Sequence, residues 1–187
     1  MINQKSGLVT FSGPTFKSLS SWETDYSFHK FIKRFMEEDM SLGDEEDNFE
    51  VIMPGKAVGE LIGGNLSLTT KMVSGKYQLD FNNKILFIEE LGFESSPEMC
   101  SGNLYYMKQN GVFDKIKGIW VGNYEHEEKI SLEKVLLDVL DGEYSFPIIK
   151  SNNFGHIDKK IVIPIGTRAQ MDTNLDIKIE LLDKCVK

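Results

Sequence analysis

The sequence predicts a mixed α/β domain from about residue 55 onward. Short apolar strand patterns alternate with helical patterns between residues 57 and 149, and three strand-like runs then follow up to residue 181. Such alternation is typical of parallel strands joined by helices, and strands joined by a tight turn at the end add antiparallel neighbours. We expect residues 1–54 to form a separate part, made of a crossing strand, an amphipathic helix and an acidic linker.

The part before residue 55 contains one strand pattern and one helix pattern. Leu8–Phe11 is β-prone and ends at the turn signal Ser12-Gly13-Pro14. A helix capped by Thr24 or Asp25 follows, and His29 lies off its apolar stripe, as a surface residue would. The stripe has helical spacing, which is typical of a face turned to the core. Its members are Phe28, Phe31, Ile32, Phe35 and Met36.

An acidic segment comes next. Glu37-Glu38-Asp39 and Asp44-Glu45-Glu46-Asp47 are runs of like charge, which repel and favour a solvent-exposed loop. The segment lacks the ligand spacing of a calcium-binding loop, so we do not predict a metal site there.

The predicted domain begins with a strand at 57–62 and a helix at 66–73. Gly63 and Gly64 precede Asn65, a good N-cap for that helix. Two glycines allow close approach of a ligand or simply of another backbone. The free N–H groups of the helix start can hold an anion such as a carboxylate.

The remaining elements follow from apolar runs and their terminating residues. Ile85–Ile88 is a continuous apolar run, typical of a buried strand, and Glu89-Glu90 follows it at once. Those carboxylates either point into a cleft or reach solvent. Further predicted elements are a helix that starts at Ser95 or Ser96 with Pro97 and ends at Gly111, a strand at 116–121, a helix at 132–140 between Ser131 and Gly142, and strands at 146–149, 161–165, 167–171 and 175–181, the last two joined by a hairpin turn at 172–174.

Composition excludes several classes of protein. The chain has 29 acidic against 21 basic residues, net charge −8, and no long basic cluster, which argues against nucleic-acid binding. The sequence contains no run of 18 or more apolar residues, so we predict no membrane span, and the N-terminus does not resemble a signal peptide. Two cysteines, Cys100 and Cys185, are too few for a disulfide framework, so we expect a cytoplasmic protein. His29, His126 and His156 share no metal-ligand spacing, and we predict neither a metal nor a cofactor.

The best candidate for chemistry is His156, on a loop between two predicted strands and next to a glycine. Glu89 at a strand end is its natural partner, because a carboxylate orients a catalytic imidazole. A nucleophilic serine on a Gly-x-Ser-x-Gly turn is missing, and neither cysteine has neighbours that would activate it. The sequence therefore offers a base and an orienting acid without a nucleophile.

Five segments between about residues 55 and 181 carry a recognisable combination of motifs: Gly63-Gly64-Asn65-Leu66, Ile85–Glu90, Asn110–Ile119, Phe154-Gly155-His156 and Ile163–Ala169. Together, and in this order, they resemble the LD-carboxypeptidases, and most closely the branch of microcin C self-immunity proteins. Leu8–Pro14 also resembles the crossing between that family's two domains.

The resemblance implies a mixed-sheet, swivelling β/α C-terminal domain of a serine peptidase with a Ser-His-Glu triad. Glu89 and His156 match the catalytic glutamate and histidine, while Gly64 and Asn65 match positions lining the substrate groove. The family's serine and oxyanion hole belong to an N-terminal nucleophile domain, which has no counterpart in these residues. Residues 90–98 also lack the Tyr and Asp-Arg pattern of peptidoglycan-recycling enzymes, which favours immunity-like peptidyl- or aminoacyl-nucleotide substrates.

Three hypotheses follow. The first is one half of a carboxypeptidase-like hydrolase, inactive alone, that acts on a peptide or peptidyl-nucleotide with a missing nucleophile domain as its partner. The second is a non-catalytic binding or dimerisation module that keeps the groove. The third is an unrelated α/β domain with a metal site. Under the first, we expect an exposed apolar patch that includes part of the Phe28, Phe31 and Phe35 stripe, and hence a homodimer.

Overall fold

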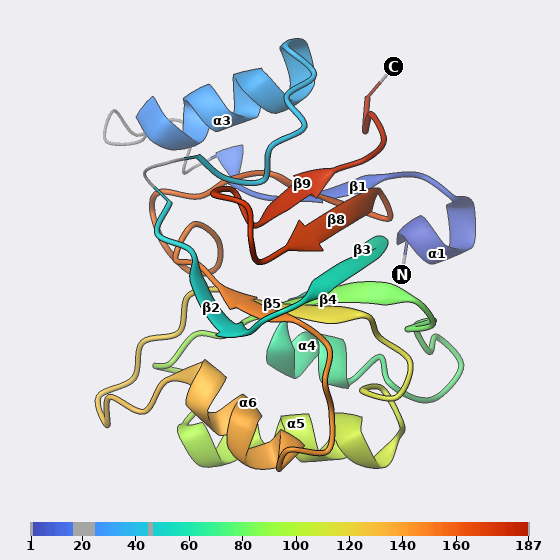
Figure 1. The fold of residues 1–187 in the computed structure, drawn as a ribbon, viewed down its shortest axis with the longest axis vertical. Coiled ribbons are helices and arrows are strands. Elements are labelled where there is room, and N and C mark those ends of the chain that lie inside the picture. The colour runs from blue at the N-terminus through green and yellow to red at the C-terminus, as the bar shows by residue number, and fades with distance from the viewer. Residues whose placement is uncertain (1, 17–24, 45–46, 187) are drawn as a thin grey trace.

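The computed structural model describes residues 2–16, 25–44 and 47–186, and within them a seven-stranded mixed sheet forms the centre (Figure 1). Its strands lie in the order β2-β6-β5-β4-β3-β8-β9, and β1 and β7 form a separate pair. The strands are β1 (Thr10–Ser12), β2 (Glu50–Met53), β3 (Lys56–Asn65), β4 (Lys84–Glu89), β5 (Gly118–Val121), β6 (Ile148–Lys150), β7 (Ile163–Ile165), β8 (Arg168–Asp172) and β9 (Ile179–Leu181). The helices are α1 (Ile2–Ser6), α3 (Asp25–Met36), α4 (Leu66–Thr70), α5 (Pro97–Gln109) and α6 (Leu132–Leu140).

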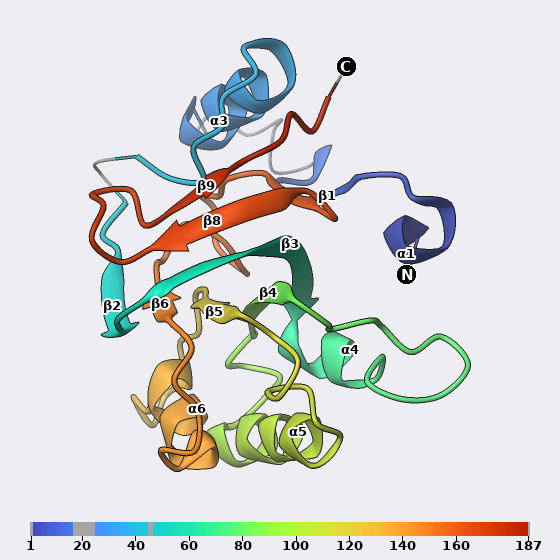
Figure 2. The same ribbon diagram turned by 45° about the vertical axis from the view of Figure 1, so that its right-hand side comes forward.

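The middle of the sheet confirms the predicted α/β class. β3, β4, β5 and β6 are parallel neighbours in chain order, while β2, β8 and β9 pair antiparallel at the two edges. The crossovers through α4, α5 and α6 all lie on one face of the sheet (Figures 1 and 2). When successive parallel strands are added to a sheet in one direction and all crossovers have the same hand, the connecting helices lie on the same face.

The apolar run in β4 is buried because both faces of the sheet are covered. Leu86 and Ile88 pack into a cluster with α4, α5 and α6, and Ile85 and Phe87 pack into a second cluster on the opposite face. Alternate side chains of a strand point to opposite faces, so a strand covered twice needs apolar residues at every position.

The second face is covered partly by residues that precede residue 55. Leu42, from the acidic segment, is fully buried in the second cluster, and α3 lies above this face (Figure 2). β2 pairs with β6 at the edge of the sheet, and β1 pairs with β7. The expected solvent-exposed acidic loop is therefore only partly observed: Glu37 and Glu38 are exposed, whereas Asp44 and Asp47 are half-buried. Glu45 and Glu46 lie outside the described residues.

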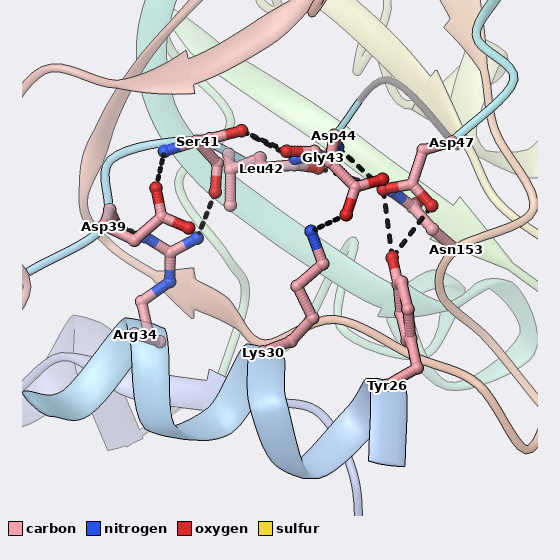
Figure 3. Close-up of polar contacts among 10 residues, drawn as sticks. All are labelled: Tyr26, Lys30, Arg34, Asp39, Ser41, Leu42, Gly43, Asp44, Asp47 and Asn153. Carbon is pink, nitrogen blue, oxygen red and sulfur yellow. Dashed lines mark hydrogen bonds and ion pairs between the residues drawn. The ribbon is translucent and has the colours of Figure 1, made fainter. Parts of the chain in front are cut away.

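Helix α3 is present where the periodicity predicts it, but its predicted inward face is wrong. Phe28 and Met36 are 51% and 74% exposed, while the buried side chains of the helix are Ser27, Lys30 and Arg34. Phe31 and Phe35 are half-buried, and the ring of Phe35 lies tilted against that of Phe11 of β1, with the ring centroids 4.6 Å apart. The polar face is buried because it meets backbone carbonyls and carboxylates rather than an apolar surface (Figure 3). The proposed cap Thr24 lies outside the described residues.

The last predicted strand is shorter than expected. Only Ile179–Leu181 forms β9, because the turn after β8 is wider than three residues and closes with the Asp172 N–H donating to the Lys178 carbonyl at 2.9 Å. Leu175 is 41% exposed as a result. Elsewhere the predicted elements agree with the structure within a few residues. None of the helices in the described part of the chain is long and apolar enough to cross a membrane.

Candidate active site at the carboxyl edge of the sheet

The carboxyl ends of the parallel strands bring the predicted site residues to one edge of the sheet. Asn65 ends β3, Glu89 ends β4, Asn123 follows β5, and the loop that carries His156 follows β6. Parallel strands end at the same edge, and ligands in open α/β sheets bind outside that edge. These residues are far apart in the sequence, and the topology alone makes them neighbours.

Glu89 and His156 form a hydrogen-bonded pair. His156 Nδ1 lies 2.7 Å from Glu89 Oε2, and the side chains are 48% and 9% exposed. Gly155 makes this approach possible: it has φ +118°, and a Cβ atom there would lie 3.2 Å from Glu89 Oε2. The Nδ1 atom is thus engaged by a buried carboxylate while the imidazole remains half open to the edge of the sheet.

The electrostatics of Glu89 are set mainly by burial. Burial raises the pKa of the Glu89 carboxyl above its ordinary value, and the hydrogen bond and charge of His156 offset only part of that rise. A desolvated carboxylate interacts more strongly with an imidazolium than a hydrated one does. The pair is therefore suited to hold and stabilise a protonated His156.

Glu90 performs a different task from its neighbour. Its carboxylate accepts hydrogen bonds from Asn65 Nδ2 at 2.6 Å and from the Ser67 N–H at 2.9 Å, and it also bonds to the Ser67 hydroxyl. Burial raises the pKa of Glu90, but hydrogen bonds from Ser67, Leu91 and Asn65 outweigh it and hold the pKa below its ordinary value. The start of α4 therefore binds an anion, as the sequence suggests, and that anion is the chain's own carboxylate.

The two glycines before Asn65 serve different purposes. A Cβ atom on Gly63 would lie 1.8 Å from the Phe87 carbonyl oxygen, so only a glycine at position 63 allows β3 to approach β4 this closely. Gly64 has φ +136° and nothing within 4 Å of a Cβ position, so open space lies beside it. Asn65 caps α4 by accepting the Leu68 N–H at 3.1 Å while it donates to Glu90. Gly64 and Asn65 thus lie at the same edge as Glu89.

Sequence reasoning missed the residues that support this edge. Asn103 of α5 donates to the Ser67 hydroxyl at 3.2 Å, and Asn123 bonds through its backbone to Glu90 and to Phe154. The Gly122-Asn123 signal at the end of β5 was visible in the sequence, because it follows a buried strand as Glu89 does. Asn103 lies inside a helix and gives no comparable signal.

The described residues provide no nucleophile beside the imidazole. Within residues 2–16, 25–44 and 47–186, His156 makes one side-chain hydrogen bond, and its partner is Glu89. Burial raises the thiol pKa of Cys100 and of Cys185, so neither thiol is activated. Ser67 is engaged with Glu90. The same part of the chain contains no group of three or more metal-ligating side chains.

The chain belongs to the LD-carboxypeptidase family: the model of the LD-carboxypeptidase C-terminal domain matches residues 58–171. This membership replaces the hypothesis of an unrelated α/β domain. A probable murein peptide carboxypeptidase of Bacillus subtilis is 32% identical over 180 residues, which are 92% of this chain and 56% of that protein. The microcin C7 self-immunity protein MccF of Escherichia coli is 26% identical over 204 residues, which are 91% of this chain and 58% of that protein.

Solved structures agree with the fold. A structure of MccF superposes with a TM-score of 0.85 at 25% identity, covering all of this chain and 64% of that one. A second MccF structure, 24% identical with the same TM-score and coverage, holds glutamyl sulfamoyl guanosine. The chain therefore spans a little more than half the length of the relatives it matches, in the region of their C-terminal domain.

Proposed function

We propose that this chain supplies the glutamate and histidine of a Ser-His-Glu triad in a serine carboxypeptidase-like hydrolase. The observation that carries the proposal is the 2.7 Å contact between His156 Nδ1 and buried Glu89 at the carboxyl edge of a family-typical sheet. With Nδ1 bonded to Glu89, Nε2 of His156 takes the proton from the serine and returns it to the leaving amine. Glu89 orients the ring and stabilises the imidazolium.

The serine comes from residues outside this chain. Two observations support this: no hydroxyl or thiol in the described residues bonds to His156, and the relatives are much longer than the matched region. The partner is accordingly a nucleophile domain with its own oxyanion hole. We place the activity in the cytoplasm, in keeping with two free cysteines.

The substrate class is a peptide or a peptidyl- or aminoacyl-nucleotide. Gly64, with open space beside it, and Asn65 line the groove that receives it. MccF binds a glutamyl sulfamoyl nucleoside, and a B. subtilis relative is described as a probable murein peptide carboxypeptidase. The segment after Glu89, which lacks the Tyr and Asp-Arg pattern of peptidoglycan-recycling enzymes, favours the nucleotide conjugate.

A second candidate function is a non-catalytic binding or dimerisation module of the same family. The observation that favours it is the lack of a nucleophile beside His156 in the described residues. In that case the groove at Gly64 and Asn65 binds a ligand without cleaving it, and Glu89 and His156 persist as a structural pair.

The test is hydrolysis of glutamyl sulfamoyl adenosine and of a muramoyl tetrapeptide. We expect no hydrolysis by the purified chain, and hydrolysis after addition of the N-terminal part of the B. subtilis relative, which precedes its matched region. His156→Ala in the mixture should abolish the activity, whereas His126→Ala, a second histidine near the same edge, should retain it. Hydrolysis by the chain alone would contradict the proposed partner. An assembled but inactive mixture would favour the non-catalytic module.

The homodimer that we propose forms through the outer face of α3, defined as Phe28, His29, Ile32 and Met36. A hollow of about 570 Å³, lined in part by Phe28, His29 and Ile32, gives room for a side chain of a second copy. Antiparallel pairing about Ile32 places Phe28 against Met36 of the second copy.

A further inference from the structure

The loop that carries His156 is held from outside the sheet by α3. Ser27, fully buried on α3, donates its hydroxyl to the Asp158 carbonyl at 3.0 Å and accepts the Lys160 N–H at 2.9 Å. One serine thus fixes two backbone groups of the segment just after His156. Because backbone groups rather than side chains are held, the path of the loop itself is constrained.

The segment just before His156 is held by the acidic segment. Asn153 is 2% exposed and donates through Nδ2 to Asp47 Oδ2 at 3.0 Å and to the Leu42 carbonyl at 3.3 Å. Its Oδ1 accepts from the Ser151 hydroxyl at 2.7 Å. Asp47 is the common partner, because it also accepts the Tyr26 hydroxyl of α3 at 2.8 Å (Figure 3). The His156 loop is therefore attached on both sides to one unit.

That unit is internally cross-linked. Buried Lys30 forms an ion pair with Asp44 at 2.6 Å, and buried Arg34 donates to the carbonyls of Ser41 and Asp39 (Figure 3). Arg34 also donates through Nε to the Val162 carbonyl. The buried polar face of α3 and the acidic segment thus make a single bracket, which we define as residues 26–47 with the gap at 45–46. A network whose members are all bonded is stiffer than any single bond in it.

We propose that Ser27 and Asp47 are positioning residues for His156. The side chain of His156 is half exposed and has Glu89 as its hydrogen-bonding partner, so the bracket, more than local packing, sets where its ring lies. The importance of this position for catalysis rests on the proposed function. That the bracket holds the His156 loop in place beside Glu89 does not depend on that function. A shift of about 1 Å in a catalytic group can cost about 100-fold in rate.

The test compares Ser27→Ala and Asp47→Ala with Asp172→Asn, which removes the charge of another buried aspartate, paired with Lys56, in a distant turn. The readout in the chain as it exists is the nuclear magnetic resonance signal of the His156 Nδ1 proton, assigned by its loss in His156→Ala. We expect exchange of this proton with water at least about 10-fold faster in both bracket variants and unchanged in Asp172→Asn. The titration of the Glu89 carboxyl, followed in the same samples, should move upward, because the His156 contact lowers its pKa.

A second measurement separates positioning from stability. Ser27→Ala removes one oxygen atom and is the milder change, so it keeps the test decisive if Asp47→Ala does not fold. In the reconstituted hydrolase, kcat should fall about 10- to 100-fold with KM unchanged, and Asp47→Asn should recover part of the loss. An unchanged Nδ1 signal in folded Ser27→Ala and Asp47→Ala would overturn the proposal. A reconstituted mixture without any activity would count against the proposed function only, since the Nδ1 signal does not depend on turnover.

Discussion

Helices α6 and α3 carry the same kind of amphipathic pattern and bury opposite faces. On α6 the apolar positions, such as Leu132 and Leu136, are buried against the sheet. On α3 the apolar positions Phe28 and Met36 are exposed, and Lys30 and Arg34 are buried. Both helices were correctly predicted from periodicity, yet the rule that the apolar stripe faces the core holds for only one of them.

The difference lies in the surface that each helix meets. α6 packs its apolar face on apolar side chains of the parallel strands, and the polar contact of Glu133 with Lys150 of β6 lies beside that face. α3 meets the carbonyls of Ser41 and Val162 and the carboxylate of Asp44, which need donors. A buried carbonyl without a hydrogen-bond donor lowers the stability of the fold. The basic side chains Lys30 and Arg34 supply donors to this surface, whereas apolar side chains would not. Periodicity therefore identifies two faces, and the opposing surface selects one.

The largest expected effect is from Arg34→Ala. The substitution removes the donors to the carbonyls of Ser41 and Val162 in a buried setting, so the free energy of unfolding should fall by about 3 kcal/mol. Urea unfolding followed by circular dichroism measures it. Arg34→Lys should recover less than half, because an ammonium group cannot match the guanidinium fork.

The matched substitution on the other helix is Leu136→Ala, fully buried in the α6 cluster, for which we expect a similar loss of about 3 kcal/mol by cavity formation. The comparison would fail if Arg34→Ala unfolded like a surface variant while Leu136→Ala did not.

An intermediate effect is expected at Glu90. Its folded pKa is lowered, so the carboxylate stabilises the fold above the ordinary glutamate pKa of about 4.3, and this contribution disappears as the pH falls through the lower folded pKa. Glu90→Gln should therefore lower the free energy of unfolding by about 1–2 kcal/mol at pH 7, and should leave it unchanged at a pH below the folded pKa of Glu90. Urea unfolding at several pH values provides the measurement. Exposed Glu94→Gln is the control, and a cost independent of pH would contradict the assignment.

The smallest effect on stability is expected at Phe28. Phe28→Ser changes an exposed side chain, so the free energy of unfolding should change by no more than about 0.5 kcal/mol. Self-association, measured by light scattering across concentrations well above micromolar, should weaken if the outer face of α3 joins two copies. Phe93→Ser, which removes another highly exposed aromatic ring, should leave it unchanged. A strictly monomeric parent chain would refute the proposed dimer.

Much of the fold was predictable because it rests on local rules. The apolar run of β4, the N-cap Asn65, a cap at Ser95 or Ser96 and the glycine that follows α6 all follow from short-range preferences. The wide turn after β8 was not predictable, because Leu175 continues a strand pattern that the tertiary structure does not use. The pairing of β1 with β7 depends on residues about 150 positions apart, and a strand pattern does not name its partner.

For the candidate site, the sequence singled out Glu89 and His156, one at a strand end and one on a loop beside a glycine. It did not reveal that Glu90 would occupy the start of α4, or that Ser27 and Asp47 would hold the His156 loop. These contacts join segments 23 to 131 residues apart. No spacing rule reaches so far, because they arise only after the sheet has set the order of its strands.

The sequence by itself determined helices α3, α4, α5 and α6, most of the strands, and the two residue types suited to act as base and orienting acid. Those features depend on backbone preferences and on the chemistry of single side chains. The tertiary structure decided that Glu89 and His156 touch, and which face of α3 is buried. Both outcomes depend on the free energy of satisfying buried polar groups on two surfaces at once, which is a property of the pair of surfaces and not of either segment alone.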